Sequence, residues 1–305
     1  MDPLDPPVTL VGERADAALL RLEPVDGGRS WLPSNRGLVT PPRADREKGW
    51  VIALAVDPGN TNLVYAGSDR ISKSTDGGHS WKTVFPPHPT RYPSVNVSAL
   101  AIAPTRPEAI YAITGDFANT SSTPAAGRTS IYKSTDAGTT WQATTVVRGS
   151  VAPTALAVDS RHPTTVYAAI GAKVLKTTNA GETWQPIAAG LPIADTRGTC
   201  HCLSQGGVKA LAVDPRRSGT VYAALTQGGI YKTTNGGQTW THTTGCGVVN
   251  QQFSANCRGP YLYLPIVAVD PARPATVYAA GQSGTGDRPR ILRSTNGGRT
   301  WATAP

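Results

Sequence analysis

The sequence lacks both a long apolar run and a helical pattern. No apolar run in the 305 residues approaches the length of a membrane-spanning helix, so no helical membrane span is expected. No segment repeats apolar residues with a 3.6-residue period over three turns, which argues against amphipathic helices. The start, MDPLDPPVTLVGERADAALL, also lacks the basic residues and apolar core of a signal peptide. A helical protein is therefore not expected.

Long basic runs are also missing, although the net charge is +9. No run of Lys and Arg exceeds two residues, so the positive charge is spread along the chain. Surfaces that bind nucleic acids need clustered positive charge, usually with aromatic side chains on which bases stack. The sequence therefore predicts no nucleic-acid partner. An anionic polysaccharide or an anionic cell surface fits the charge better.

The chain instead repeats an eight-residue motif, first seen as STDGGHSW at 74–81. The other full copies are STDAGTTW at 134–141, TTNAGETW at 177–184, TTNGGQTW at 233–240 and STNGGRTW at 294–301, and a weaker copy, PVDGGRSW, stands at 24–31. His79 is replaced in every other copy, so this histidine is incidental. The constant positions of the full copies are Asp76, Gly78, Trp81, Asp136, Gly138, Trp141, Asn179, Gly181, Trp184, Asn235, Gly237, Trp240, Asn296, Gly298 and Trp301.

Turn chemistry explains these constant positions better than catalysis does. Asp or Asn caps a tight turn through side-chain to backbone hydrogen bonds, Gly supplies backbone angles that other residues avoid, and Trp buries a large ring between sheets. Because Asn replaces Asp in three full copies, a general acid or a nucleophile is not expected there. We therefore interpret the motif as a structural hairpin, and the Asp of the AVDP turns receives the same interpretation.

A second repeat precedes each copy and defines a four-stranded unit. ALAVDPGNTNLVYAGS at 53–68 recurs at 99–114, 155–170, 210–225 and 267–281, and each copy reads as two short strands joined by a turn. A third strand enters the eight-residue motif and a fourth follows its Trp. We name these strands A, B, C and D. Repeated units of four antiparallel strands are typical of propeller blades.

The sequence thus predicts an all-β fold, a single β-propeller domain over residues 1–305. Five complete blades are expected, with a partial N-terminal blade that lacks strand A. This count favours six blades in the ring, with seven as the alternative. The expected blade boundaries are 8–34 for the partial blade and 51–86, 97–146, 153–190, 208–245 and 264–305 for the complete ones.

The repeated motif resembles the Asp-box, or BNR, repeat. The paired AVDP…VYA and KSTDGGxTW units are similar to those of sialidase-like, xyloglucanase-type and sortilin-type propellers and of the photosystem II assembly propeller. The resemblance covers nearly the whole chain and implies the fold. It does not select a function, because these relatives include hydrolases, receptors and assembly factors.

Blade topology indicates where a ligand would bind. The A–B and C–D turns of a blade share one face, whereas the irregular B–C and D–A connections share the other. Loops on a rigid scaffold commonly carry binding residues, so a glycan or protein partner is expected on the irregular face. The candidate ligand-binding residues are Arg91, Tyr92, Arg128, Arg197, Tyr261, Tyr263 and Arg288. Arginine forks would meet carboxylates, and aromatic rings would stack on sugars.

The motifs of the hydrolytic relatives are missing from this chain. The Arg-Ile-Pro segment near the N-terminus of catalytic sialidases is absent. The region that matches the RTDIGG-like first blade of xyloglucanases reads RLEPVDGG at 21–28. A glycosidase needs two carboxyl groups, one with a raised pKa, and the loops offer only weak candidates in Asp116, Asp195 and Asp287. A non-catalytic binding propeller is favoured, with a glycoside hydrolase or polysaccharide lyase as the alternative.

Four cysteines bear on the compartment. Cys200, Cys202, Cys246 and Cys257 are confined to two neighbouring D–A connections. Their even number favours two disulfides and an oxidising compartment, so we expect a secreted or otherwise extracytoplasmic protein whose signal peptide has been removed. The protein could belong to a larger extracellular assembly. The alternative use of CHC is a zinc site, but its spacing matches no standard motif, and no metal or cofactor is expected.

Overall fold

The computed structural model describes most of the chain. The described residues are 10–12, 19–22, 31–38, 51–85, 95–116, 128–148, 153–171, 173–191, 207–225, 229–244, 248–249, 252–253, 262–283 and 290–304. The chain forms two compact units, Met1–Val151 (unit 1) and Ala152–Pro305 (unit 2). Each unit is described by itself. The expectation of a single domain over residues 1–305 stays a prediction.

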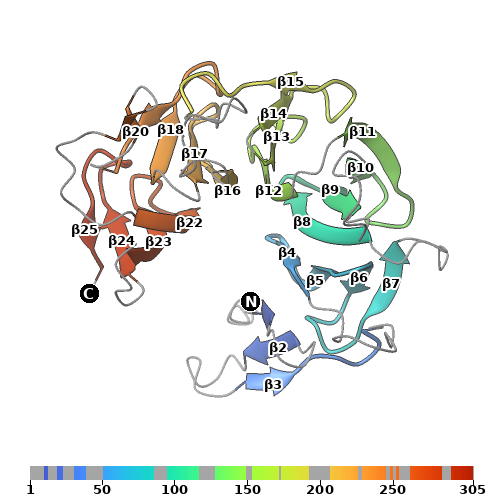
Figure 1. Ribbon diagram of the computed structural model, residues 1–305. Coiled ribbons are helices and arrows are strands. Elements are labelled where there is room, and N and C mark those ends of the chain that lie inside the picture. The colour runs from blue at the N-terminus through green and yellow to red at the C-terminus, as the bar shows by residue number, and fades with distance from the viewer. Residues whose placement is uncertain are drawn as a thin grey trace, which may run out of the picture. The chain divides into compact units, whose positions relative to one another are not determined.

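Unit 1 contains one three-stranded sheet and two four-stranded sheets, all antiparallel (Figure 1). The three-stranded sheet comprises β1 (Leu10–Gly12), β2 (Leu19–Leu22) and β3 (Trp31–Pro33). The next sheet comprises β4 (Ala53–Asp57), β5 (Asn60–Gly67), β6 (Ile71–Ser74) and β7 (Lys82–Phe85). The third comprises β8 (Val95–Ala103), β9 (Arg106–Asp116), β10 (Arg128–Ser134) and β11 (Gln142–Arg148).

Unit 2 contains three four-stranded antiparallel sheets. Their strands are β12 (Pro153–Val158), β13 (Val166–Ile170), β14 (Lys173–Thr177) and β15 (Gln185–Pro186); β16 (Val208–Val213), β17 (Val221–Leu225), β18 (Ile230–Thr233) and β19 (Thr241–His242); and β22 (Leu262–Val269), β23 (Val277–Ser283), β24 (Arg290–Ser294) and β25 (Ala302–Thr303). The first strands, β12, β16 and β22, lie side by side (Figure 1).

The predicted all-β architecture is confirmed, because the described residues form five four-stranded sheets and a three-stranded N-terminal sheet. The described residues contain no helix, and so none that could cross a membrane. One detail differs from the expectation. The 243–265 connection was expected to be irregular, yet it contains a small hairpin of β20 (Val248–Val249) and β21 (Gln252–Phe253). Each of the five larger sheets is called a blade below.

Neighbouring blades of one unit pack face to face. Strand B is buried on both of its faces, so it reads as a continuous apolar run, VYAA in unit 2. In unit 1, Tyr65 and Ile71 pack against Leu100 and Ile110 of the following blade. In unit 2, Tyr222 and the strands around it pack against β22 and β23 in the same way. Burial of these faces stabilises the stack by about 25 cal/mol per Å² of apolar surface.

Candidate functional site

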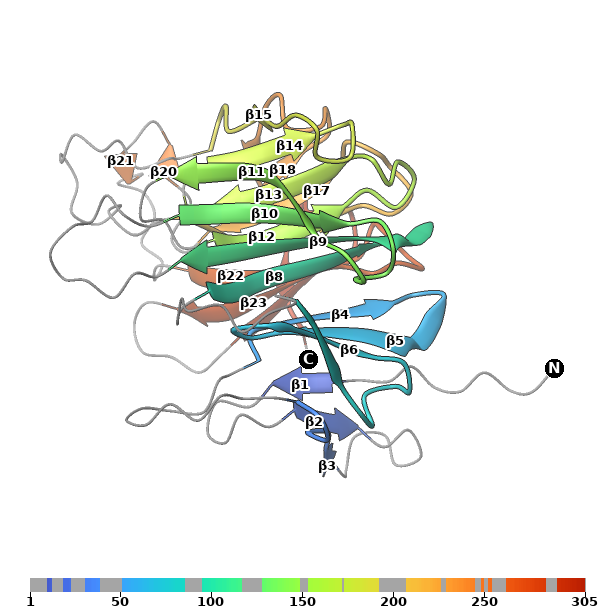
Figure 2. The ribbon, with the colours of Figure 1, turned by 90° about the vertical axis from the view of Figure 1, so that its right-hand side faces the viewer.

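The A–B turn and the Asp-box motif lie at the same end of every blade. The backbone N–H of the residue after the box Asp or Asn donates to a carbonyl of the A–B turn in all five blades; these bonds run from Gly77 to Asn62, Ala137 to Glu108, Ala180 to Thr164, Gly236 to Gly219 and Gly297 to Ala275. Figure 2 shows the β4–β5 and β8–β9 turns at one end of unit 1. We call this end the turn end, and the opposite end, which carries the B–C and D–A connections, the loop end.

The box is a closed hydrogen-bond unit. Asp76 Oδ1 accepts from Ser74 Oγ at 2.7 Å and from the backbone N–H of Ser80 at 2.9 Å. Ser74 Oγ in turn accepts from the N–H of Gly78 at 2.8 Å. Gly78 has φ of 93°, a conformation that favours glycine. These hydrogen bonds hold the backbone of the turn in place.

The Asn boxes keep this turn geometry although one hydrogen bond runs in the opposite direction. This is the bond between the box side chain and the hydroxyl four residues later. In unit 1, Thr140 Oγ1 donates to Asp136 Oδ2 at 2.7 Å. In unit 2, Asn179 Nδ2 donates to Thr183 Oγ1 at 2.9 Å, while its Oδ1 still accepts from the N–H of Thr183 at 3.0 Å. A hydroxyl can donate or accept, so the turn accommodates either residue. Only the Asp version carries a charge.

Hydrogen bonding holds the two box aspartates in the ionised form. At Asp76, desolvation alone would raise the pKa, but hydrogen bonds from Ser80 and Ser74 outweigh it and lower the pKa to about 2. At Asp136, the Thr140 hydroxyl and backbone bonds lower the pKa to about 2. A general acid needs the opposite shift. Neither carboxyl group is therefore suited to proton donation near neutral pH.

A tyrosine and a lysine of one blade bind the box of the next blade. Tyr65 Oη and Lys73 Nζ both donate to the carbonyl of Ala137, at 2.8 and 2.9 Å. Tyr222 Oη and Lys232 Nζ donate to the carbonyl of Gly297, at 3.1 and 2.7 Å. We call each such pair a clamp. Burial raises the pKa of Tyr222 to about 12, which keeps its phenol a donor at neutral pH.

The clamp positions recur in the remaining blades. Lys176 Nζ donates to the carbonyl of Gly236 at 3.1 Å, and its ammonium lies 5.5 Å from the centre of the Tyr167 ring. In the last blade, Arg293 takes the lysine position opposite Tyr278. Its Nε is buried with no hydrogen-bond partner among the described residues.

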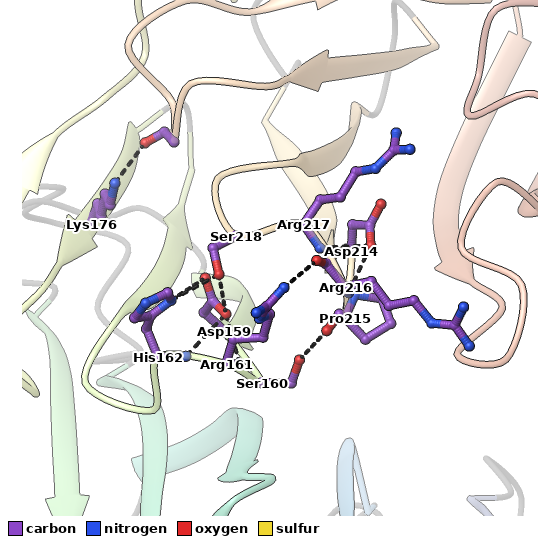
Figure 3. A network of polar contacts seen from close by, with 11 residues as sticks. Asp159, Ser160, Arg161, His162, Lys176, Asp214, Pro215, Arg216, Arg217 and Ser218 are labelled. Atoms are coloured by element: carbon purple, nitrogen blue, oxygen red, sulfur yellow. Dashed lines mark hydrogen bonds and ion pairs between the residues drawn. The ribbon is translucent and has the colours of Figure 1, made fainter.

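The A–B turns of unit 2 are connected by arginines (Figure 3). Asp159 Oδ1 caps its turn by accepting from the N–H of Arg161 at 2.9 Å. Arg161 Nη1 donates to the carbonyl of Arg216 at 2.9 Å, and Arg216 Nη2 donates to that of Ala272 at 2.8 Å. Arg161, Arg216 and Ala272 each stand two positions after the turn Asp of their own blade. The result is a ladder of side-chain bonds across all three blades.

Five exposed arginines consequently share the turn end of unit 2; they are Arg161, Arg216, Arg217, Arg273 and Arg299. Arg273 pairs with Asp270 at 3.2 Å. Arg217 and Arg299 make no salt bridge within the described residues. Burial, followed by the charges of Arg217 and Arg299, lowers the pKa of Lys232, and Asp214 acts in the opposite direction. Lys232 therefore responds to the charges of both arginines.

The structure brings two predicted loop-end residues together. Asp116, the last residue of β9, pairs in register with Arg128, the first residue of β10. Tyr263 of β22 pairs with Gln282 of β23 at the loop end of the last blade. The other predicted ligand and catalytic residues, and all the cysteines, lie outside the described residues; they are Arg91, Tyr92, Asp195, Arg197, Cys200, Cys202, Cys246, Cys257, Tyr261, Asp287 and Arg288. Their assignments stay predictions.

Family comparison agrees with the repeat architecture. The model of the DUF6242 beta propeller domain matches residues 116–305. The chain belongs to this family. A search of curated proteins returned no match.

Solved structures with the same fold include hydrolases and a peptide-binding protein. The propeller is similar to the GH74 xyloglucanase from Xanthomonas campestris, with a TM-score of 0.65, 17% identity and 96% of this chain covered. It is similar to the GH74 enzyme of Niastella koreensis, with a TM-score of 0.59, 18% identity and 96% coverage. It is also similar to YCF48 bound to D1 peptide, with a TM-score of 0.57, 19% identity and 98% coverage. These identities establish the fold alone.

The chain spans less than half of the two GH74 chains, 43% and 44%, and 79% of the YCF48 chain. The expected resemblance to xyloglucanase-type propellers is thus confirmed for the fold. Because the match covers less than half of each GH74 chain, the activity of the whole GH74 proteins is not assigned to this chain.

Sequence reasoning missed two features of the propeller. The clamp residues were interpreted only as strand residues, although Tyr recurs at the same position of strand B before each full box and Lys directly precedes four of the five full boxes. The arginines of the turn end were counted as spread charge because no two of Arg161, Arg216 and Arg273 are close in the sequence. Comparing the repeats column by column would have revealed both features.

Proposed function

We propose that the protein is a non-catalytic, extracytoplasmic binding propeller that engages a glycan or a protein partner through its loop ends. A glycosidase needs a raised carboxyl pKa next to an ionised partner. Asp76, Glu108, Asp136 and Asp270 have lowered pKa values and lie at the turn ends, so none of these four supplies such an acid. The observation that supports binding over hydrolysis comes from the loop end, where Asp116 stands opposite Arg128 in the strand register.

The register at the loop end supports the same choice. Asp116 was the predicted acid candidate nearest a described strand, and it stands directly opposite Arg128. This register places an acidic and a basic residue type at the same level of the loop end, which suits the binding of a polar ligand. Within this proposal, Arg91, Tyr92, Arg197, Tyr261, Tyr263 and Arg288 provide the other contacts.

The related folds support a binding role for such a scaffold. One neighbour is titled a xyloglucanase and another is bound to a D1 peptide, so glycans and peptides are the two ligand classes we propose. The proposed extracytoplasmic location rests on the four cysteines and on their expected pairing in two disulfides. A larger extracellular assembly is compatible with this role.

The test measures binding and hydrolysis on the same probes, xyloglucan and polygalacturonate. We expect retention in affinity gels without release of reducing ends. Tyr261→Ala and Tyr263→Ala should abolish retention on xyloglucan, a neutral glycan, because they remove rings that stack on sugars. His79→Ala, which removes an exposed ring at the turn end, should retain wild-type binding. Release of reducing ends that is lost in Asp116→Asn, Asp195→Asn or Asp287→Asn would instead establish the hydrolase or lyase alternative.

A further inference from the structure

The turn end of unit 2 has the chemistry of an anion-binding surface. Arg161, Arg216, Arg217 and Arg299 are exposed, and each guanidinium has five N–H donors. Arg161 and Arg216 use one of their terminal nitrogens to hold the next turn. This contact orients the side chains before any ligand arrives, which reduces the entropy lost on binding.

The cations of this surface outnumber its carboxylates. Asp159 and Asp214 are 1% and 3% exposed, and their Oδ1 atoms cap the turns below the arginines. Asp270 is occupied by Arg273. Glu182 is the remaining exposed acid of the unit 2 boxes. The guanidinium groups of Arg217 and Arg299 therefore stay available to a ligand, whereas Lys232 is held by the carbonyl of Gly297.

We propose that the turn end of unit 2 binds an acidic polysaccharide, with Arg217 and Arg299 as the principal contacts and Arg161 and Arg216 extending the surface along the ladder. Guanidinium groups bind carboxylates and sulfates through paired N–H donors. The arginines recur from blade to blade, so the surface offers repeated cations to a polymer with repeated anions. This binding surface is separate from the loop ends proposed above.

A polysaccharide fits this surface better than a nucleic acid does. The described turns of unit 2 are short and capped by aspartate, and they contain no helix that could enter a DNA groove. The box indole Trp240 is only 4% exposed and donates to the carbonyl of Ile187 at 2.7 Å, so it is not available for stacking on bases. An acidic polysaccharide needs neither feature, because its anions meet the paired guanidinium donors directly.

The experiment compares two double variants of the full chain that each remove two positive charges. Arg217→Gln with Arg299→Gln alters the proposed surface. Arg106→Gln with Lys82→Gln removes two exposed cations from unit 1. Binding to immobilised dextran sulfate and polygalacturonate is measured over a range of salt concentrations. Circular dichroism melting verifies that both variants are folded.

We expect the unit 2 variant to bind both polysaccharides at least about fivefold more weakly than wild type, and the unit 1 variant to change binding less than twofold. Equal losses in the two variants would overturn the proposal, because net charge alone would explain the affinity. Absence of wild-type binding would also overturn it. A duplex DNA probe provides the last comparison. If the wild-type protein binds DNA as tightly as the polysaccharides at equal salt, and the unit 2 variant loses this binding, the surface would be assigned to nucleic acid.

Discussion

The turn ends of the two units share one set of hydrogen bonds but differ in charge. Unit 1 has Asp76 and Asp136 in its boxes, and Gly59 and Thr105 at the turn positions where unit 2 has Arg161 and Arg216. Unit 2 has Asn in all its boxes and a ladder of arginines across its turns. The comparison separates what the fold needs from what a ligand could use. Turn capping needs an oxygen acceptor, whereas the sign of the charge is left open.

The largest expected effect tests what the units share. Trp81→Ala and Trp240→Ala should each lower the free energy of unfolding by about 3–5 kcal/mol, as large buried side chains do when truncated. Both indoles are 5% exposed or less and donate to a carbonyl, of Ser34 and Ile187 respectively. Trp301→Ala, which removes a partly exposed indole, serves as the control and should cost less. Urea unfolding followed by circular dichroism measures the change, and a small loss in either buried variant would contradict the shared core.

The clamps offer a test that should divide the units. Lys73→Met and Lys232→Met should each cost about 1.5–3 kcal/mol, because each removes a charged hydrogen bond to a partly buried carbonyl. Only Lys232→Met should also weaken binding to dextran sulfate, since Lys232 lies beside Arg217 and Arg299. Tyr65→Phe, which removes a neutral hydrogen bond, should cost about 1 kcal/mol. Equal losses of dextran sulfate binding in the two lysine variants would contradict the inference that only the turn end of unit 2 binds this polymer.

The smallest effect concerns acid stability. The folded pKa of Asp76 and Asp136 is about 2, below the ordinary value of 3.8. Their stabilisation is therefore complete above about pH 4 and is lost as the pH falls through about 2. The double variant Asp76→Asn with Asp136→Asn should have nearly the wild-type free energy of unfolding at pH 7. Between about pH 4 and pH 2, its free energy of unfolding should change less with pH than that of the wild type. Asp69→Asn, which lies outside the boxes, is the control. Tryptophan fluorescence in acid unfolding measures the change, and an unchanged acid limb would contradict the role of the two carboxylates.

Much of the fold could be predicted from particular residues. The Gly78 and Trp81 positions mark the C–D hairpin, and the AVDP turn marks the A–B hairpin, because the chemistry of each is local. The β20–β21 hairpin could not be foreseen, since Val248 and Phe253 carry no turn signal comparable to the repeats. The pairing of Asp116 with Arg128 could not be read either, because the connection between them leaves the register open until the strands pair.

The candidate surface of unit 2 was hidden for a different reason. Arg161, Arg216 and Arg299 are separated by more than fifty residues along the chain, so a search for basic runs finds nothing. Stacked blades place equivalent turn positions side by side, and each ladder bond spans one repeat. The inference that the charge is spread holds along the chain but not in space.

The sequence by itself determined the repeat, the four strands of each blade and the turns that join them, because these depend on interactions within a few residues. Only the tertiary structure decided which side chains of different blades meet. The clamps and the arginine ladder arise from the register between successive blades, and burial of Tyr222 and its counterparts between blades sets that register. The same packing collects dispersed arginines into one charged surface.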